Sequence, residues 1–368
     1  MNLAKKFFFL FSLLSSAFFL SGCQDVIFAN IRKEVKLNDG TVAGSIRALI
    51  RFNDGTSEYI YLANGAAIYR KKNTGNVADH REGGWEKVCS ARNIGNSDYV
   101  ITLAADKSNL YALTATWEEN TSKGQNRWNG RYIYTSTDGK NWDKVETVEI
   151  KTDPTETGTR NPALYLFCTN TIKNDNRQAF FNYAETGYKL DGTSKPNPTE
   201  MDKYASSCAY INEPPQFASS TSTYYGSASC TNETTKGGDA TIRYYSSGST
   251  LHWYGTVSGS TVSGSTGVGS YIYSLAVTAD YILVGTASGI KHYRLNGGNV
   301  GGEEEFERNA DAIMSSGYEV NALLVVDPSK NELDNAIYSA IDFEGRSQQF
   351  DHVCLWAYYP SRGNWNRD

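Results

Sequence analysis

Apolar and polar residues alternate along the chain in short runs that glycine, asparagine and aspartate interrupt. Runs rich in tyrosine, valine, isoleucine and threonine between such breaks are typical of β-strands and turns. An apolar strand with a polar end recurs six times, and a second strand follows each copy. The copies begin at Ser45, Asp98, Asn161, Lys203, Ser270 and Tyr318. The pattern predicts an all-β chain, in which only Glu303–Met314 has a helical spacing.

Four of the repeats close on a tryptophan that follows glycine, asparagine or histidine: Trp85, Trp142, Trp253 and Trp365. A four-stranded sheet cannot bury both faces alone, so such sheets stack around an axis as the blades of a β-propeller. We expect six blades of four antiparallel strands over residues 44–368, with Ser45 and Tyr318 near the starts of innermost strands. Seven blades, with one repeat merged, and a pair of two-layer β-sandwiches are the alternatives.

The segment "TVSGSTVSGSTG", Thr256–Gly267, is a tandem duplication of five residues. Small polar repeats of this kind are typical of flexible connectors, and we expect one here. An exposed glycosylation or contact loop is the alternative.

The first residues have the pattern of a secretory signal peptide, predicted over residues 1–22. Lys5 and Lys6 precede the run "FFFLFSLLSSAFFL", which is shorter than the about 20 residues of a membrane-spanning helix. The sequence "LSGC", ending at Cys23, resembles the bacterial lipobox, although an ordinary signal peptide with a coincidental cysteine remains the alternative. The resemblance implies cleavage before Cys23 and acylation of that residue, and several acyl chains anchor a protein stably.

The residues after Cys23 bear on the destination. In lipoproteins of the enterobacterial type an aspartate directly after the cysteine favours the inner membrane, whereas here Gln24 intervenes before Asp25. The resemblance therefore favours an outer-membrane or surface position in the cell envelope. Residues 23–43 form either a tether or a strand that closes the ring by pairing with the last repeat.

The charge pattern excludes one class of partner. The formal net charge is −5, and removal of Lys5 and Lys6 changes it from −5 to −7. The chain has no basic stripe, so we expect no nucleic-acid partner. No sequence pattern indicates a cofactor.

Five cysteines other than Cys23 are spaced too widely for a zinc motif. We predict a disulfide between Cys208 and Cys230, on two strands of a hairpin with its midpoint at (208 + 230)/2 = 219. Cross-strand partners have Cβ atoms about 4.5–5.5 Å apart and a disulfide needs about 3.8 Å, so only a close pair fits. A Cys168–Cys208 bridge and two free thiols are the alternatives.

The stretch "STDGKNW" resembles the Asp-box turn of sialidase-like propellers, in which Ser-x-Asp-x-Gly-x-x-Trp connects two strands. Ser136, Asp138, Gly139 and Trp142 match, with one residue missing between Asp138 and Gly139. The resemblance implies a structural turn, in which Asp138 caps backbone amides and Gly139 supplies a positive φ.

No pattern indicates a catalytic or metal centre. The histidines, which are His80, His252, His292 and His352, lack ligand spacing, and we expect structural or solvated roles. The sequence contains no nucleophile elbow, phosphate loop or calcium loop. We interpret the acidic run Glu303–Glu305 as a solvated face.

Stretches such as "STYYGS" and "WAYYP" combine aromatic rings with hydroxyl groups, which suits protein or glycan surfaces, and packing of the tyrosines between neighbouring blades is the alternative. We therefore expect a membrane-anchored lipoprotein whose propeller is a non-enzymatic binding or scaffolding platform for a protein or glycan. The alternative is a cell-envelope glycoside hydrolase or lyase with a carboxylate pair in the central depression. The pattern does not identify the ligand.

Overall fold

The computed structural model describes a large part of the chain between residues 42 and 368. The described residues are 42–44, 46, 48–120, 125–145, 164–168, 170–171, 179–183, 186–190, 197–199, 230–232, 240–257, 259–304, 318–343 and 354–368. Residues 40–368 form one compact unit.

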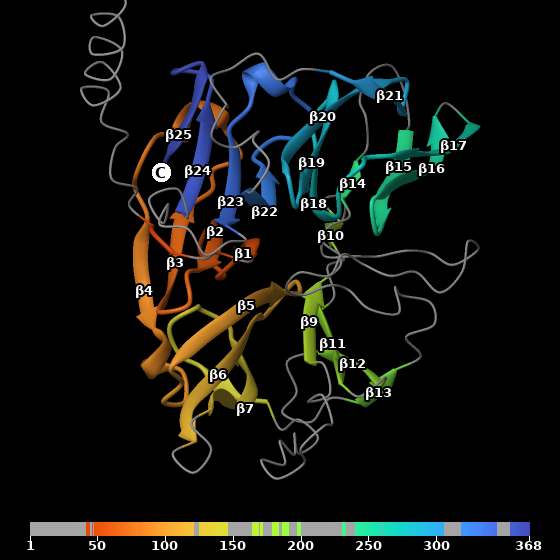
Figure 1. Ribbon diagram of the computed structural model, residues 1–368. Coiled ribbons are helices and arrows are strands. Elements are labelled where there is room, and N and C mark those ends of the chain that lie inside the picture. The colour runs from red at the N-terminus through yellow and green to blue at the C-terminus, as the bar shows by residue number, and fades with distance from the viewer. Residues whose placement is uncertain are drawn as a thin grey trace, which may run out of the picture. The chain divides into compact units, whose positions relative to one another are not determined.

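The described residues form six β-sheets, which we number in chain order and which occupy successive colour bands in Figure 1. Sheet 1 contains β1 (Leu49–Asn53), β2 (Glu58–Ala63), β3 (Ala67–Lys72) and β4 (Glu86–Ser90). Sheet 2 contains β5 (Tyr99–Ala105), β6 (Leu110–Asn120), β7 (Gln125–Ser136) and β8 (Asp143–Lys144). Sheet 3 contains β9 (Leu164–Cys168), β11 (Ala179–Tyr183), β12 (Thr186–Leu190) and β13 (Asn197–Thr199).

The remaining sheets come from the second half of the chain. Sheet 4 contains β10 (Asn170–Thr171), β14 (Cys230–Asn232), β15 (Ala240–Ser247), β16 (Thr250–Val257) and β17 (Ser260–Gly267). Sheet 5 contains β18 (Ile272–Val277), β19 (Tyr281–Thr286), β20 (Gly289–Asn296) and β21 (Asn299–Glu303). Sheet 6 contains β22 (Tyr318–Val325), β23 (Ile337–Phe343), β24 (Cys354–Tyr359) and β25 (Asn364–Arg367).

Sheets 1, 2, 5 and 6 are antiparallel meanders, in which each strand pairs with the next one along the chain. Sheet 3 is also an antiparallel meander, in the order β9, β11, β12 and β13. The short strand β10, which follows β9 along the chain, pairs in parallel with β14 of sheet 4 instead. Within the described part, the predicted all-β organisation in four-stranded antiparallel sheets is therefore confirmed for sheets 1, 2, 3, 5 and 6, whereas sheet 4 has five strands and one parallel pair. The number of blades and the closure of a ring stay predictions.

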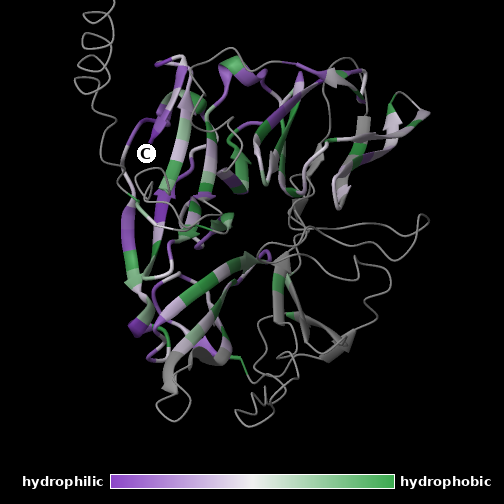
Figure 2. Cartoon of the chain, viewed as in Figure 1, coloured by the Kyte–Doolittle hydropathy of each residue, from purple (hydrophilic) through white to green (hydrophobic). Residues whose placement is uncertain are grey.

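Apolar residues fill the space between neighbouring sheets, as the alternation along the strands requires. Buried clusters join sheet 1 with sheet 2, sheet 2 with sheet 3, sheet 4 with sheet 5, sheet 5 with sheet 6, and sheet 6 with sheet 1. Figure 2 shows hydrophobic green along strands of sheets 5 and 6 and paler colours on β16 and β17. In β16, for example, Leu251 and Trp253 are buried, whereas Tyr254, which points to the other face of the same strand, is 60% exposed.

Sheet 1 and sheet 6 meet at what we call the first–last junction, where residues more than 300 positions apart come together. Ala43 forms an antiparallel bridge with Cys354, and the Leu355 amide donates to the Val42 carbonyl at 3.3 Å. The Val42 amide donates in turn to the Asp368 carbonyl at 3.3 Å. Residues 23–41 lie outside the described part, so their role as tether or closing strand stays a prediction.

The connector prediction for Thr256–Gly267 is wrong, because β17 pairs with the whole of β16 in an antiparallel ladder. Threonine and valine in the repeat are β-branched and suit a strand, whereas the composition alone resembles a linker. Gly259, at φ +77°, lies between the two strands and supplies the turn. The first copy of the repeat therefore contains the turn, and the second copy, residues 261–265, pairs with residues 252–256 of β16.

Gly264 has a specific reason to be glycine. It is the cross-strand partner of Trp253, and a Cβ atom at Gly264 would lie 2.3 Å from Cζ2 of the indole. Glycine at this position leaves space for the indole on that face of the ladder, while Gly264 itself is exposed.

The closing tryptophans occupy two kinds of position. Trp85 and Trp142 directly precede the fourth strands β4 and β8, and Trp365 lies in the fourth strand β25. Trp253 instead lies in β16, because β17 adds a further strand to its repeat.

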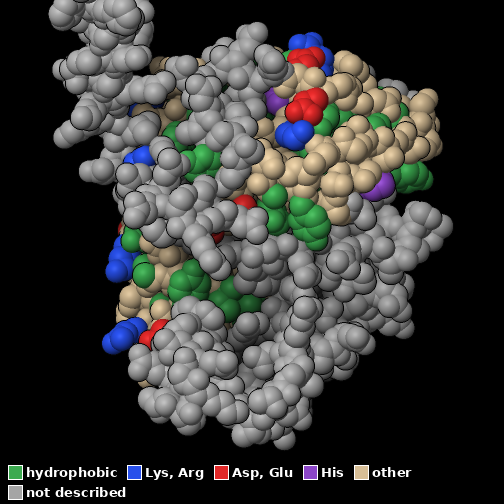
Figure 3. Space-filling view, in the orientation of Figure 1, with side chains coloured by type: hydrophobic (Ala, Val, Ile, Leu, Met, Phe, Trp, Pro, Cys, Tyr) green, Lys and Arg blue, Asp and Glu red, His purple; other side chains and the backbone are tan. Residues whose placement is uncertain are grey.

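The predicted helix Glu303–Met314 falls almost wholly outside the described residues, and its first residue, Glu303, ends β21. Within the described part, helical structure consists of three 3₁₀ turns, namely η1 (Val77–Asp79), η2 (Ala91–Asn93) and η4 (Glu332–Asp334). No helix in that part has the length and apolarity to cross a membrane. On the face seen in Figure 3, the described charged side chains are scattered and do not gather into a basic field.

Candidate functional site

A groove of about 980 Å³ lies where three connections of sheets 1 and 6 come together. It is bounded by the β3–β4 connection (73–85), the β22–β23 connection (326–336) and the β24–β25 turn (360–363). The lining residues are mostly polar and come from both sheets: Val77, Ala78, His80, Arg81, Ser329, Lys330, Asn331, Asp334, Pro360 and Ser361. Ligand pockets are typically about 300–1,000 Å³ in volume, so this groove lies at the upper end of that range.

His80 lies at the floor of the groove and is 3% exposed. Its Nδ1 atom lies 2.8 Å from the Tyr338 hydroxyl and its Nε2 atom lies 3.0 Å from Oδ1 of Asn73. Because the Asn73 amide nitrogen donates to Glu58, the carbonyl oxygen of Asn73 faces the ring. Nε2 therefore carries the proton, and Nδ1 accepts from Tyr338.

The environment keeps His80 uncharged at neutral pH. Burial lowers the pKa of His80 from 6.5 to about 4, and the positive charges of Lys71 and Arg51 add to this shift. The floor of the groove is thus a neutral imidazole with both ring nitrogens occupied. The prediction of a structural role fits these contacts.

A buried ion pair fixes the β3–β4 wall. Lys71 Nζ lies 3.0 Å from a carboxylate oxygen of Asp368 and donates to the Arg81 carbonyl and to the Tyr359 hydroxyl. The other oxygen of Asp368 accepts from the Gly83 amide. Burial lowers the pKa of Lys71, and the charge of Asp368 opposes that shift. These bonds hold residues 81–83 against sheet 6.

Aromatic rings surround the same ammonium group. The rings of Trp85, Tyr338 and Tyr359 lie 5.1–5.5 Å from Lys71 Nζ, within the range of cation–π attraction. The Trp85 indole N–H also donates to Asp368 at 2.9 Å. Trp85, one of the four tryptophans that close the repeats, also belongs to the cluster that joins sheet 1 and sheet 6.

The opposite wall is fixed from sheet 5. Glu332 of η4 is buried, and its Oε2 atom lies 2.6 Å from Nε2 of His292 on β20. The Glu332 amide donates to Asp280 at 2.8 Å. The buried Asn335 closes the base of this connection by bonding to both backbone groups of Asp327. Both walls are therefore preorganised by buried polar contacts.

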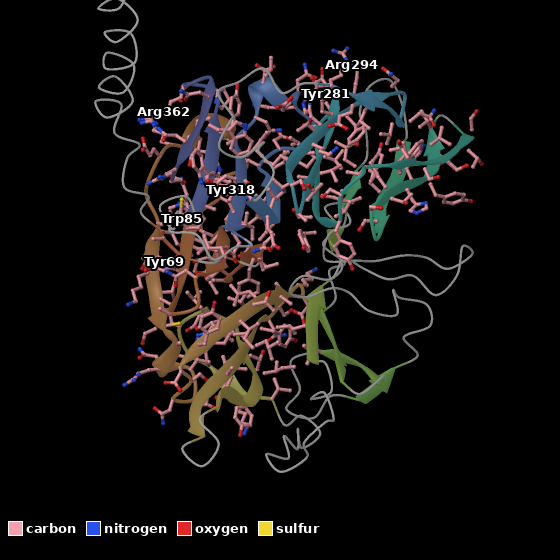
Figure 4. All side chains as sticks on the ribbon, in the orientation of Figure 1. Tyr69, Trp85, Tyr281, Arg294, Tyr318 and Arg362 are labelled. Carbon is pink, nitrogen blue, oxygen red and sulfur yellow. The ribbon has the colours of Figure 1, made fainter. Side chains whose placement is uncertain are left out.

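The rim of the groove carries two exposed cations without an acidic partner. Among the described residues, no acidic side chain pairs with Arg81 or Lys330, which come from opposite walls. Asp334 adds one exposed carboxylate. Arg362, labelled in Figure 4, pairs with Glu82 and so contributes no net charge.

The Asp138 turn lies elsewhere, between β7 and β8 of sheet 2. Asp138 accepts from the amides of Lys140 and Asn141, each at 2.8 Å, while Ser136 Oγ accepts from the Gly139 amide at 2.8 Å. Burial raises the pKa of Asp138, but these hydrogen bonds outweigh it and lower the pKa to about 2. Gly139 has φ +73°.

The rest of the turn packs into the molecule. Trp142 packs on the cluster between sheets 1 and 2, and a Cβ at Gly139 would lie 2.7 Å from the Tyr61 ring. The geometry is that of a structural turn, and its membership of the Asp-box class stays a prediction.

Several predicted residues cannot be placed. Cys23, Cys208 and His352 lie outside the described residues, and Cys230 begins β14, so the predicted disulfide stays a prediction. Burial raises the pKa of the Cys89 thiol to about 11, which keeps it protonated.

The acidic run is described only at Glu303 and Glu304. These carboxylates lie 3.2 Å from Lys291 and 3.1 Å from Arg294 respectively. Arg294 and Tyr281, labelled side by side in Figure 4, are joined by a 2.8 Å hydrogen bond. Within the described part, no group of three or more histidine, cysteine or acidic side chains gathers at metal-binding distance.

Sequence comparison places the chain in no family. No family model matches it, and no curated protein matches it.

Several solved structures align at low identity. YCF48 from Cyanidioschyzon merolae is 11% identical over 89% of this chain and 86% of its own, with a TM-score of 0.36. BBS1N in complex with ARL6DN is 8% identical over 89% of this chain and 92% of its own, with a TM-score of 0.38. The extracellular domain of the one-component system BT4673 from B. thetaiotaomicron is 12% identical over 84% of this chain and 39% of its own, with a TM-score of 0.34. At these TM-scores the alignments support no conclusion on fold or function.

Proposed function

We propose that the chain is a cell-envelope lipoprotein, anchored through Cys23, whose six-bladed propeller binds a protein or glycan in the groove between sheets 1 and 6. The groove carries this proposal, because its walls are fixed by buried polar contacts while its rim and floor present polar groups. Preorganised loops on a rigid scaffold are the usual setting of a binding site.

The propeller part of the proposal is supported by the strand order within the sheets and by the clusters that join neighbouring sheets. The hydrogen bonds from Val42 to sheet 6 support ring closure at the first–last junction. A crystal structure with seven sheets around the axis, or with two separate sandwiches, would contradict it.

The binding part is tested by filling the groove. Ser361 is exposed on the β24–β25 turn, and Ser108 lies on the β5–β6 turn, away from the groove lining. We expect Ser361→Trp to abolish capture of the partner from an envelope extract and binding to a glycan array, whereas the control Ser108→Trp retains both. Retention of all binding by Ser361→Trp would place the site elsewhere.

The anchor is tested separately. Cys23→Ala should prevent incorporation of radiolabelled palmitate and leave the precursor uncut before residue 23. Unchanged labelling in this variant would remove the lipoprotein assignment.

A glycoside hydrolase or lyase is the second candidate, and one observation favours it. Glu319 and Asp342 face each other across β22 and β23, and the Tyr273 hydroxyl donates to Glu319 at 3.4 Å. Cross-strand partners point to the same face with Cβ atoms about 4.5–5.5 Å apart, so both carboxyl groups lie on one face of the sheet, as a glycosidase pair requires. Glu319 is only 7% exposed, so binding ranks first. Turnover of a glycan library that Glu319→Gln abolishes would reverse this ranking.

A further inference from the structure

The charge of the groove indicates the chemistry of its ligand. Arg81 and Lys330 stand on opposite walls, and Asp334 is the one exposed carboxylate among the lining residues. The chain as a whole has a net charge of −5, so a locally positive groove is not a general property of its surface. An anionic ligand gains from both cations, and a guanidinium binds a carboxylate through two parallel hydrogen bonds.

The floor agrees with this polarity. The pKa of His80 is lowered first by burial and then by the positive charges of Lys71 and Arg51. The carboxylates of Asp79 and Asp368 oppose the two cations, but their effects on the pKa of His80 are the smaller ones. A ligand that brought its own positive charge to the floor would meet the same unfavourable potential.

The lining also distinguishes between classes of anion. Glycan sites present an aromatic face on which a sugar ring stacks, but the described lining residues include no Phe, Tyr or Trp, and the imidazole of His80 is only 3% exposed. The apolar lining consists instead of Val77, Ala78 and Pro360, which suit small aliphatic side chains. Ser329, Asn331 and Ser361 supply hydrogen-bonding groups at the rim for a peptide backbone.

We propose that the groove binds an acidic peptide segment of a protein partner, with Arg81 and Lys330 contacting its carboxylates from opposite walls. This inference rests on the proposed binding function and names the class of ligand.

The experiment measures binding of defined probes to the full processed chain in a neutral detergent. The probes are fluorescein-labelled deca-glutamate, deca-glutamine of equal length, and deca-galacturonate as an anionic glycan, followed by fluorescence anisotropy. We expect deca-glutamate to bind most tightly and its affinity to fall as salt rises from about 50 to about 300 mM, because exposed charges are screened.

Variants assign the effect to the groove. Arg81→Gln and Lys330→Gln should each weaken deca-glutamate binding about threefold to fivefold, the range for exposed ion pairs. Asp334→Asn should strengthen it about twofold, since it removes the opposing charge. Lys107→Gln, at an exposed lysine on the β5–β6 turn, is the matched control and should change nothing.

Three results would overturn the inference: equal binding of deca-glutamine, tighter binding of deca-galacturonate, or no effect of both cation variants. The Ser361→Trp experiment separates this failure from that of the proposed function. If Ser361→Trp abolishes partner capture while deca-glutamate does not bind, the groove is the site and its ligand is not acidic peptide. If partner capture survives Ser361→Trp while deca-glutamate binding responds to the variants as expected, the binding site of the natural partner lies elsewhere.

Discussion

The first–last junction and the β16–β17 hairpin solve the same problem, which is to hold strands at the margin of a sheet, by different means. At the junction, Lys71 and Asp368 form a buried ion pair inside a set of aromatic rings. In the hairpin, eight consecutive backbone pairs join the strands, and most β17 side chains are exposed serine, threonine and glycine.

The difference shows where each region is vulnerable. A buried charge depends on one partner, because removal of that partner leaves an unpaired ion in a nonpolar surrounding. A backbone ladder tolerates most side chains, since the hydrogen-bonding groups belong to every residue. Single substitutions and a change of pH at the junction should therefore lower the stability of the protein strongly. In the hairpin, a substitution should lower it only where a side chain contacts the Trp253 indole.

The largest effect is expected at Asp368. Asp368→Asn leaves Lys71 buried without a counter-charge, and the free energy of unfolding should fall by about 3–5 kcal/mol, as measured by urea denaturation. The control Asp334→Asn removes an exposed carboxylate and should change it by less than about 0.5 kcal/mol.

A double variant sharpens this result. Lys71→Met combined with Asp368→Asn removes both charges, and it should be more stable than Asp368→Asn alone. Equal stability of the two would show that the uncompensated ammonium is not the cause of the loss.

The next effect concerns pH and His80. Its pKa is about 4 in the folded protein, against 6.5 for a histidine side chain in the unfolded chain, so below pH 6.5 the unfolded chain takes up the proton first. Stability is thus lost as pH falls from 6.5 to 4, and by pH 5 the loss reaches about 2 kcal/mol.

Urea denaturation at pH 7 and pH 5 checks the assignment. His80→Gln should reduce the difference in the free energy of unfolding between pH 7 and pH 5 by about 2 kcal/mol. The same difference in both proteins would assign the acid sensitivity to other groups.

The smallest effect is expected in the hairpin. Gly264→Ala places a Cβ against the Trp253 ring, and the free energy of unfolding should fall by about 1–2 kcal/mol. Gly267 is the matched control, because a Cβ added there would have no atom within 4 Å. If Gly264→Ala is as harmless as Gly267→Ala, the close packing of Trp253 on β17 is not needed for stability.

Local pattern was sufficient for much of the fold. The strand that begins at Tyr318 starts where the pattern predicts, and β18 begins at Ile272, two residues after the predicted start at Ser270. Such local patterns are a property of neighbouring residues. The same reasoning failed at Ser260–Gly267, where composition indicated a linker and the β-branched residues within it indicated a strand.

The groove could not be predicted from the sequence. Arg81, Lys330 and Ser361 belong to no motif and lie up to 280 positions apart, so nothing local relates them. The absence of ligand spacing around His80 predicts a structural role, and its hydrogen bonds with Tyr338 and Asn73 fit that role. The interpretation of an acidic solvated face agrees with the ion pairs of Glu303 and Glu304, whereas spacing does not identify their basic partners.

The bonds between Val42 and Asp368 have a consequence for the order of folding. Contacts between residues over 300 positions apart form late, since a chain must lose much entropy to bring them together. During synthesis sheet 1 is complete long before sheet 6 has been made. The apolar face of sheet 1 that packs against sheet 6 therefore stays exposed until the residues of sheet 6 have been added. A nascent chain with such an open apolar face is prone to aggregate, and we expect it to depend on a chaperone until the last strand arrives.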